Sequence, residues 1–346
     1  MRFSNTLKNC FLLTSSFQSY NISSTSLPAL ISSFSNVSWK KYFIAIAAMV
    51  IMANGSSYAG TSAWNVAGTD ETTLTGAITA TKLNKTGTGV GIIAPTLTTN
   101  AVTSSVDIQG GTLQLNVTAA NAFGSANAAI PITIESGATL AASLSGGVTL
   151  TNPIIIGAGS SATGTITGLG WNGTGTQNVG PYAITLSGAI SQPATNSGNT
   201  LALVGGGVIT LSGTNNTGSY PLTGGITVST TGTNLCIGGT NAIPTTLASG
   251  INLAAGTILS TATGISPTVP PGVNIVLSGA ASILPAASQT LTLNSAITGN
   301  FALTVGAAGT AGTVVKFGGT NTNNAAINVA RWHTRTYKHW SSCWLC

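Results

Sequence analysis

Short runs in which every second residue is aliphatic or aromatic recur along this chain after residue 60. Residues 113–117, 130–134 and 301–305 show this alternation, and Gly, Asn and Ser interrupt such runs after four to six residues. A period of two is typical of half-buried β-strands. No window after residue 60 has the spacing of an amphipathic helix. The sequence therefore predicts an all-β fold with almost no helix.

The strands belong to a longer self-similar pattern. The hexapeptide Leu-Thr-Gly-Ala-Ile-Thr at 74–79 recurs in related form at 186–191 and 293–298, which predicts two long units and part of a third. Asn172-Gly173 is the body's only Asn-Gly dipeptide, the type that favours two-residue hairpin turns, so a sandwich of hairpins is disfavoured. A coil of parallel strands, with Gly and Asn at the corners, fits better. At about 20–25 residues per rung, residues 60–330 would form roughly eleven to thirteen rungs.

Charged residues are scarce in the body of the chain, although the net charge is +6 and the pI about 9.3. Between residues 60 and 330 there is no Arg and no His. The positive charge comes from the two ends, so the body is not expected to bind nucleic acid. The charged residues of the body are Lys82, Lys85, Lys316, Asp70, Glu71, Asp107 and Glu135.

This inventory argues against an enzyme. Glycoside hydrolysis needs a pair of carboxylates, but Asp70 and Glu71 are adjacent and would point to opposite sides of a strand. Asp107 and Glu135 would align only if whole rungs separated them. Lys82 and Lys85 lie near a Gly-rich turn, but the sequence there has no phosphate-loop pattern, and both are interpreted as solvated. We predict no catalytic residue, no cofactor and no metal.

Residues 39–59 have the features of a secretory signal peptide. Lys40-Lys41 precede an apolar run over 42–52, and small residues follow at Ser57 and Ala59. This order predicts cleavage between Ala59 and Gly60 by the export machinery; the alternative is a buried helix. Residues 1–38 are then a Ser/Asn-rich extension or the result of a start site placed too early. No later apolar run approaches the ~20 residues of a spanning helix.

The tail at 331–346 differs abruptly from the body. It holds both His of the chain, three of its six Trp and two of its four Cys. Three interpretations stand side by side: a zinc site, a basic-aromatic nucleic-acid patch, or a tail translated out of frame. The zinc ligands would be His333, His339, Cys343 and Cys346. Cys236 is the lone cysteine of the body, so the body is expected to form no internal disulfide.

Several segments resemble passenger regions of bacterial autotransporters, specifically the autotransporter-associated β-strand repeat. They are Gly-Gly-Thr-Leu-Gln-Leu at 110–115, Asn-Ala-Phe-Gly at 121–124, Ser-Gly-Ala-Thr-Leu at 136–140, Leu-Ser-Gly-Thr-Asn at 211–215 and Thr-Gly-Gly-Ile-Thr-Val at 223–228. The resemblance covers most of residues 70–330. It implies a right-handed parallel β-helix (β-solenoid) displayed on, or released from, a Gram-negative outer membrane. Such proteins carry a C-terminal translocator barrel, and nothing in this chain could form one.

The missing barrel and the odd tail have one explanation. Leu83 lies 27 residues before Gly110, and Leu303 lies 28 residues before Arg331. The codons from Arg331 onward, read one base later, can encode Gly-Gly-Thr-Leu, which would continue the repeat. We therefore interpret 331–346 as a probable out-of-frame tail.

Three functions remain open at this stage. The first is a non-catalytic surface-exposed or secreted β-helix, an adhesin or structural protein with an unknown surface ligand, for which a host protein and a glycan are the candidates. The second is a non-functional fragment of a frameshifted gene. The third, least favoured, is a β-helix enzyme acting on polysaccharide. The first predicts export to the periplasm, the cell surface or the medium.

Overall fold

The computed structural model describes residues 58–68, 71–74, 78–93, 101–117, 123, 129–157, 159–171, 177–215, 220–306 and 312–330. All of them belong to one compact unit, Ser57–Cys346. In this part of the chain no helix is long and apolar enough to span a membrane. The predicted extension at 1–38, most of the predicted signal peptide at 39–59 and the tail at 331–346 lie outside the described residues.

The named elements of these residues are all β-strands, and all but two pair in parallel sheets. The six-stranded sheet contains β1 (Tyr58–Asn65), β3 (Thr79–Thr86), β5 (Ala101–Ile108), β7 (Ile132–Ile134), β10 (Ile154–Ile156) and β15 (Ile190–Ser191). The ten-stranded sheet contains β2 (Glu71–Leu74), β4 (Val90–Ile93), β6 (Thr112–Leu115), β8 (Thr139–Ala142), β11 (Thr163–Thr167), β16 (Thr200–Val204), β18 (Gly225–Val228), β20 (Gly250–Leu253), β23 (Ile275–Leu277) and β26 (Ile297–Gly299).

Two further parallel sheets and one hairpin complete the fold. The eight-stranded sheet contains β9 (Val148–Leu150), β14 (Ile184–Leu186), β17 (Val208–Leu211), β19 (Asn234–Ile237), β21 (Ile258–Thr261), β24 (Ala281–Leu284), β27 (Leu303–Val305) and β29 (Ile327–Val329). The three-stranded sheet contains β22 (Thr268–Val269), β25 (Thr290–Leu293) and β28 (Val314–Phe317). The antiparallel hairpin is β12 (Gly170–Trp171) with β13 (Gln177–Val179).

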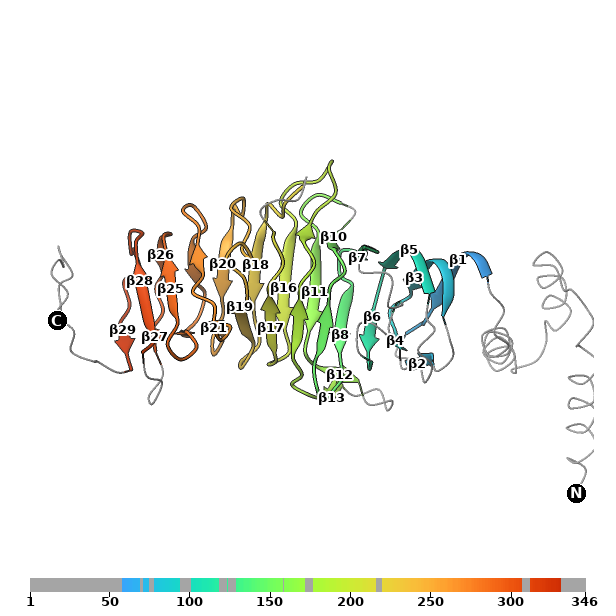
Figure 1. Cartoon of the computed structure of the whole chain (residues 1–346), viewed down its shortest axis with the longest axis horizontal. Helices are drawn as coiled ribbons and strands as arrows, with labels where there is room; N and C mark the ends of the chain where they lie inside the picture. The colour runs from blue at the N-terminus through green and yellow to red at the C-terminus, as the bar shows by residue number, and fades with distance from the viewer. Residues whose placement is uncertain are drawn as a thin grey trace, which may run out of the picture. The chain divides into compact units, whose positions relative to one another are not determined.

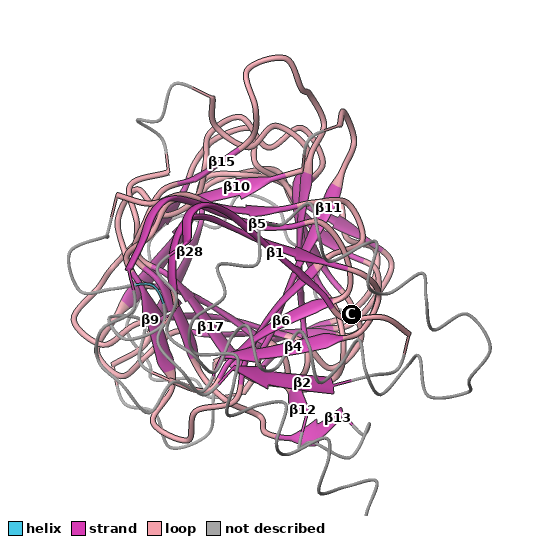
Figure 2. Cartoon of the chain, turned by 90° about the vertical axis from the view of Figure 1, so that its right-hand side faces the viewer, coloured by secondary structure: helices cyan, strands magenta, loops and turns pink. Residues whose placement is uncertain are grey.

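The chain visits the sheets in turn, so the strands coil around one axis. In a full turn, β20 of the ten-stranded sheet is followed by β21, then β22, and β23 returns to the ten-stranded sheet beside β20. Figure 1 shows the strands stacked along this axis, and Figure 2 shows them surrounding it when viewed from the end. The predicted all-β parallel β-solenoid is thereby confirmed.

The solenoid has about 9 turns, fewer than the eleven to thirteen predicted. Regular turns match the expected length, since Ile226 pairs with Ile251 and Ile251 with Ile275. One turn is much longer: Ala162 bonds to Asn199, 37 residues later. The hairpin β12–β13 and its flanks are inserted there. This insertion lengthens the turn from 25 to 37 residues and so accounts for about half a turn of the difference.

The long repeat predicted from the hexapeptide is not a structural unit. Leu74 ends β2 in the ten-stranded sheet, Leu186 ends β14 in the eight-stranded sheet, and Leu293 ends β25 in the three-stranded sheet. The three copies therefore lie at different corners. The motif covers the end of one strand, a corner and the start of the next strand. The same sequence can therefore occur at any corner of the solenoid. The repeating unit is the single turn.

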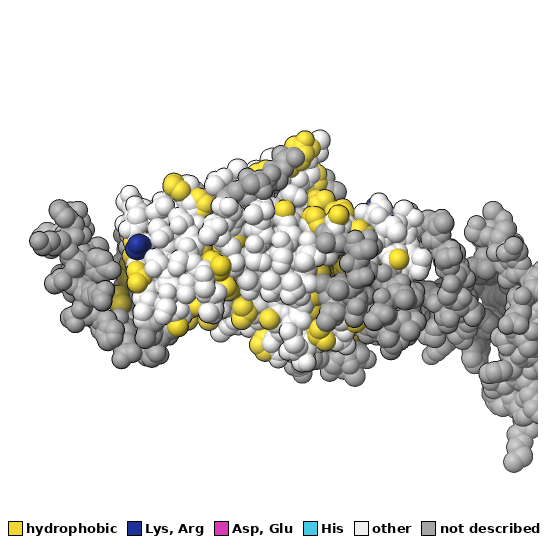
Figure 3. Space-filling view, in the orientation of Figure 1, with side chains coloured by type: hydrophobic (Ala, Val, Ile, Leu, Met, Phe, Trp, Pro, Cys, Tyr) yellow, Lys and Arg dark blue, Asp and Glu magenta, His cyan; other side chains and the backbone are white. Residues whose placement is uncertain are grey.

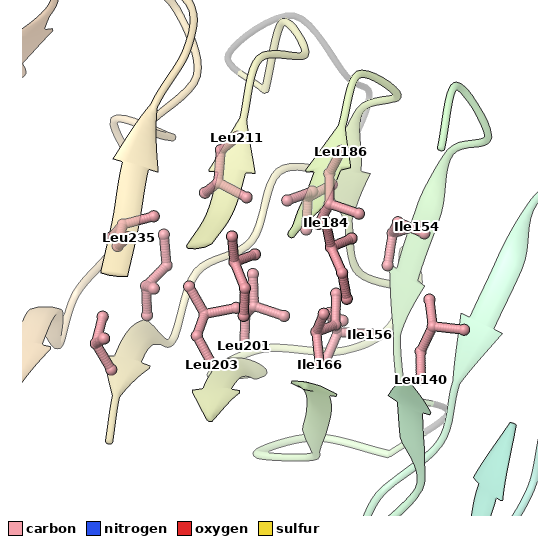
Figure 4. Close-up of a cluster of buried hydrophobic side chains, with 14 of the residues drawn as sticks. Leu140, Ile154, Ile156, Ile166, Ile184, Leu186, Leu201, Leu203, Leu211 and Leu235 are labelled. Atoms are coloured by element: carbon pink, nitrogen blue, oxygen red, sulfur yellow. The ribbon is translucent and has the colours of Figure 1, made fainter. Parts of the chain in front are cut away.

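Inward side chains stack from turn to turn into columns. In the ten-stranded sheet, one column runs through pairs in register and consists of Leu140, Ile166, Leu203, Val228, Leu253 and Leu277. These side chains are at most 2% exposed. Figure 4 shows buried Leu and Ile side chains from different sheets pointing toward one another inside the coil. The core is therefore continuous along the axis, and each turn is covered by its neighbours.

The prediction of half-buried strands is wrong for β6. All four of its residues are buried, including Gln114, which donates a hydrogen bond to Ser143 Oγ at 2.9 Å. A Cβ atom built on Gly170 of the hairpin would lie 2.4 Å from Ser143 Cβ and 3.3 Å from Gln114. The hairpin therefore covers the outer face of the sheet at this point, which alternation within β6 alone did not indicate.

Glycine permits close packing at a corner between β14 and β15. A Cβ atom on Gly188 would lie 2.1 Å from the carbonyl oxygen of Asn152 in the preceding turn. We expect Gly188→Ala to destabilise the protein by about 1–3 kcal/mol, because the backbones of two turns must separate. Urea unfolding followed by circular dichroism measures this. Gly146→Ala is the control, since its Cβ would meet nothing within 4 Å; equal losses for both variants would contradict the stacking of these corners.

Candidate functional site

Ionisable side chains of the described residues gather on neighbouring strands near the N-terminal end of the solenoid. Lys82 and Lys85 lie on β3, Asp107 lies on β5, and Glu135 follows β7. Asp107 pairs with Thr133, so Glu135 is two residues out of register with it. The two carboxylates therefore do not face each other across the strands. Asp70 lies outside the described residues, as does the side chain of Glu71, which belongs to β2.

Asp107 is held by polar neighbours on the outer face. Its Oδ2 atom lies 3.2 Å from Lys82 Nζ and accepts a hydrogen bond of 2.8 Å from Gln109 Nε2. Its Oδ1 atom is buried without a hydrogen-bond partner, as is Oδ1 of Asn84, which lies opposite Asp107 in register. Among the described residues no group of three His, Cys, Asp or Glu could hold a metal. The ion pair with Lys82 partly neutralises the Asp107 carboxylate.

Lys85 is fully buried, so its prediction as a solvated residue is wrong. It lies between Trp64 and Ile108 in register, at a position of the strand that faces the interior. Its ammonium donates hydrogen bonds to the carbonyl oxygens of Thr86, Gly87 and Gly110, at 2.9, 3.0 and 3.0 Å. Lys85 therefore ties the corner after β3 to the corner of the next turn. Its two-residue spacing from the inward Leu83 was the signal for burial.

The environment of Lys85 favours a structural role over a catalytic one. Burial lowers the pKa of its ammonium from 10.5 to about 8, because the charged form is desolvated. The group is still mostly protonated at pH 7, and its three donors match the three carbonyl oxygens. A protonated amine that is fully hydrogen-bonded is a poor nucleophile.

The lowered pKa of Lys85 predicts a specific dependence of stability on pH. The unfolded chain holds the proton up to about pH 10.5, whereas the folded chain loses it near pH 8. The unfolded state therefore binds more protons in this window, and stability rises with pH by at most about 3 kcal/mol. The urea midpoint of unfolding should therefore rise between about pH 8 and pH 10.5 in the wild type and in Lys82→Met. It should not rise in Lys85→Met, which lacks the titrating group. A rise of the same size in Lys85→Met would contradict the assignment.

The predicted cleavage site lies at the start of the first strand. Ala59 and Gly60 belong to β1, whose register with β3 continues without a break from Thr61↔Lys82 to Asn65↔Thr86. Cleavage between Ala59 and Gly60 would leave that continuous stretch intact. Cleavage itself stays a prediction.

The remaining surface of the described solenoid is rich in uncharged polar side chains. Outward positions of the eight-stranded sheet carry Thr149, Thr185 and Thr210 in register. Figure 3 shows one face of the molecule, which is largely white with scattered apolar side chains. Such surfaces form hydrogen bonds but supply no acid or base.

Comparison with known proteins adds no assignment. No protein-family model, curated protein or solved structure matches the chain. Function must therefore be inferred from the fold and its side chains.

Proposed function

We propose that residues 60–330 form the passenger-like β-solenoid of an exported, autotransporter-like protein that acts by binding or as a structural rod. The observation that carries this proposal is a parallel solenoid whose outward positions bear hydroxyl and amide groups. Asp107 forms an ion pair with Lys82, and the buried Lys85 donates its hydrogen bonds to backbone carbonyl oxygens. An adhesin or stalk needs a long, regular surface, which stacked turns provide.

The proposal includes export through the segment at 39–59. We would fuse the full chain to a phosphatase reporter that is active only in the periplasm, in a Gram-negative host. Active reporter and a mature N-terminus within residues 55–62 are expected. Ile46→Asp, inside the apolar run, should abolish reporter activity, whereas Ser32→Asp, outside it, should not. Unprocessed chain in the cytoplasm would overturn this part of the proposal.

The binding role has its own test. Purified chain is applied to arrays of glycans and of extracellular host proteins. Because the outward groups are mostly uncharged, binding should persist when the salt concentration is raised, unlike an interaction between exposed charges. Binding that disappears when salt is added would contradict recognition by the uncharged outward groups. No binding on either array would leave the structural rod as the function.

A non-functional fragment of a frameshifted gene is the second candidate, favoured by apolar side chains that are exposed in the last described turn. Phe317 and Val329 are 44% and 46% exposed there. Sequencing the DNA beyond codon 330 tests it. The shifted frame should encode further Gly/Thr-rich turns and then a translocator barrel, whereas immediate stop codons would exclude a frameshift.

A further inference from the structure

The corner after β3 and the corner of the next turn present backbone oxygens to a buried point of the solenoid. The carbonyl oxygens of Thr86, Gly87 and Gly110 lie 2.9, 3.0 and 3.0 Å from the ammonium of Lys85, whose side chain is completely buried. None of these three hydrogen bonds goes to a carboxylate. The cation is therefore held by peptide dipoles, whose oxygen ends also coordinate free cations in proteins.

The backbone around these oxygens is fixed by hydrogen bonds in which the Lys85 ammonium takes no part. The Thr86 carbonyl oxygen also accepts a hydrogen bond from Val66 N–H at 3.1 Å. Gln109 N–H, directly after β5, donates to the backbone carbonyl oxygen of Lys85 at 2.8 Å. Gly87 has a positive φ of 75°, and a Cβ atom built on it would collide with the Val66 carbonyl oxygen. The positions of the three oxygens are therefore set by the packing of neighbouring turns.

We propose that the three carbonyl oxygens form a preorganised site for a primary ammonium group, which the native chain fills with its own lysine. The ammonium is tethered and so binds at a high effective concentration. Removing the lysine side chain should uncover the site, because the oxygens stay in place and lose their donors. The ligand is a small alkylammonium ion: its three N–H donors match the three acceptors, and its alkyl part fills the space of the lysine stem beside Trp64 and Ile108. This inference does not depend on the proposed function.

The test uses the full chain with Lys85→Ala and propylammonium chloride as the probe, whose carbon chain and nitrogen match the atoms that the substitution removes. Without the probe, the urea midpoint of unfolding should be lower than in the wild type. Propylammonium should raise it, by the same increment for each tenfold increase in concentration above the dissociation constant, as binding to the folded state requires. The wild-type midpoint should not change, because its site is occupied. If Lys85→Ala does not fold in buffer alone, folding that depends on propylammonium, followed by circular dichroism, is the expected result.

Three controls separate binding at this site from general effects of the salt. Tetramethylammonium chloride carries the same charge without an N–H donor, so it should not raise the midpoint of Lys85→Ala. Lys85→Met keeps an unbranched stem in the same space and should not respond to propylammonium. Lys82→Ala removes an ammonium whose side chain is 37% exposed and paired with Asp107, and its midpoint should not rise either.

Other outcomes would overturn the proposal. A midpoint of Lys85→Ala that propylammonium does not move would mean that the oxygens form no site without the lysine. Equal rises with tetramethylammonium would mean a general effect of the salt. Equal rises in Lys85→Met or Lys82→Ala would place the binding elsewhere. A Lys85→Ala chain that stays unfolded with and without propylammonium would show that the corners are not preorganised.

Discussion

Leu203→Asp is expected to unfold the central turns of the solenoid. Leu203 is completely buried and stacks between Ile166 and Val228 in the column of the ten-stranded sheet. A carboxylate there would have apolar neighbours above and below, so its desolvation is not compensated. The loss should exceed about 4 kcal/mol, which is enough to unfold most domains. We expect loss of the β-type circular dichroism signal and rapid proteolysis of the variant.

The matched control is Ala202→Asp on the same strand. Ala202 precedes Leu203 and points to the outer face, between Thr165 and Thr227. The same charge at this position should change stability by less than about 1 kcal/mol. If Ala202→Asp unfolded the chain and Leu203→Asp did not, the assignment of inner and outer faces would be reversed.

Asn199→Ala is expected to have the second-largest effect. The Asn199 side chain is completely buried; its Oδ1 atom accepts from Ala162 N–H at 3.1 Å, and its Nδ2 atom donates to Ile156 C=O at 2.6 Å. Alanine would remove both bonds inside the protein. At about 1–3 kcal/mol for each buried group left without its partner, the loss should reach roughly 2–5 kcal/mol. The urea midpoint of unfolding measures it.

Asn252→Ala is the control, because it removes the amide of an asparagine that is not fully buried. Asn252 lies on the outer face of β20, half-buried, and its Oδ1 atom accepts one hydrogen bond from Ser278 Oγ. Its replacement should cost less than about 1 kcal/mol, because water can take over that bond. Equal losses for the two variants would show that Asn199 does not link the turns in the way described.

The sequence predicted the kind of fold because alternation is local. Ile132 and Ile134 were identified as inward, and both are completely buried. Phe301 was placed in the same pattern as Leu303, but it lies in a corner before β27 and is 44% exposed. The alternation of apolar and polar residues in the sequence runs on past the end of the strand. In the structure the backbone turns at the corner, so the side chain there no longer points inward.

The candidate site was less predictable, because it depends on which residues of different turns become neighbours. Lys82 meets Asp107, and Lys85 reaches Gly110, only once the length of each turn is fixed. Turn lengths vary with insertions such as the hairpin β12–β13. Asn172-Gly173 stands between these two strands in the sequence and was a local signal for the hairpin, but it did not indicate how much the turn would lengthen. The inward position of Lys85 was visible in the alternation of β3, but a lysine is rarely buried and was therefore read as solvated.

The stacking of turns in register is the central claim, and distances between spin labels test it most directly. Thr165, Ala202, Thr227, Asn252, Val276 and Thr298 occupy successive outward positions of the ten-stranded sheet. With native cysteines replaced, labels at Thr165 and Val276 should be about 19 Å apart, and labels at Thr165 and Thr298 about 24 Å apart, because each turn adds ~4.8 Å. Pulsed electron resonance that gives both distances, allowing for the length of the labels, would support the parallel solenoid. Equal distances for the two pairs, or a second pair closer than the first, would contradict it.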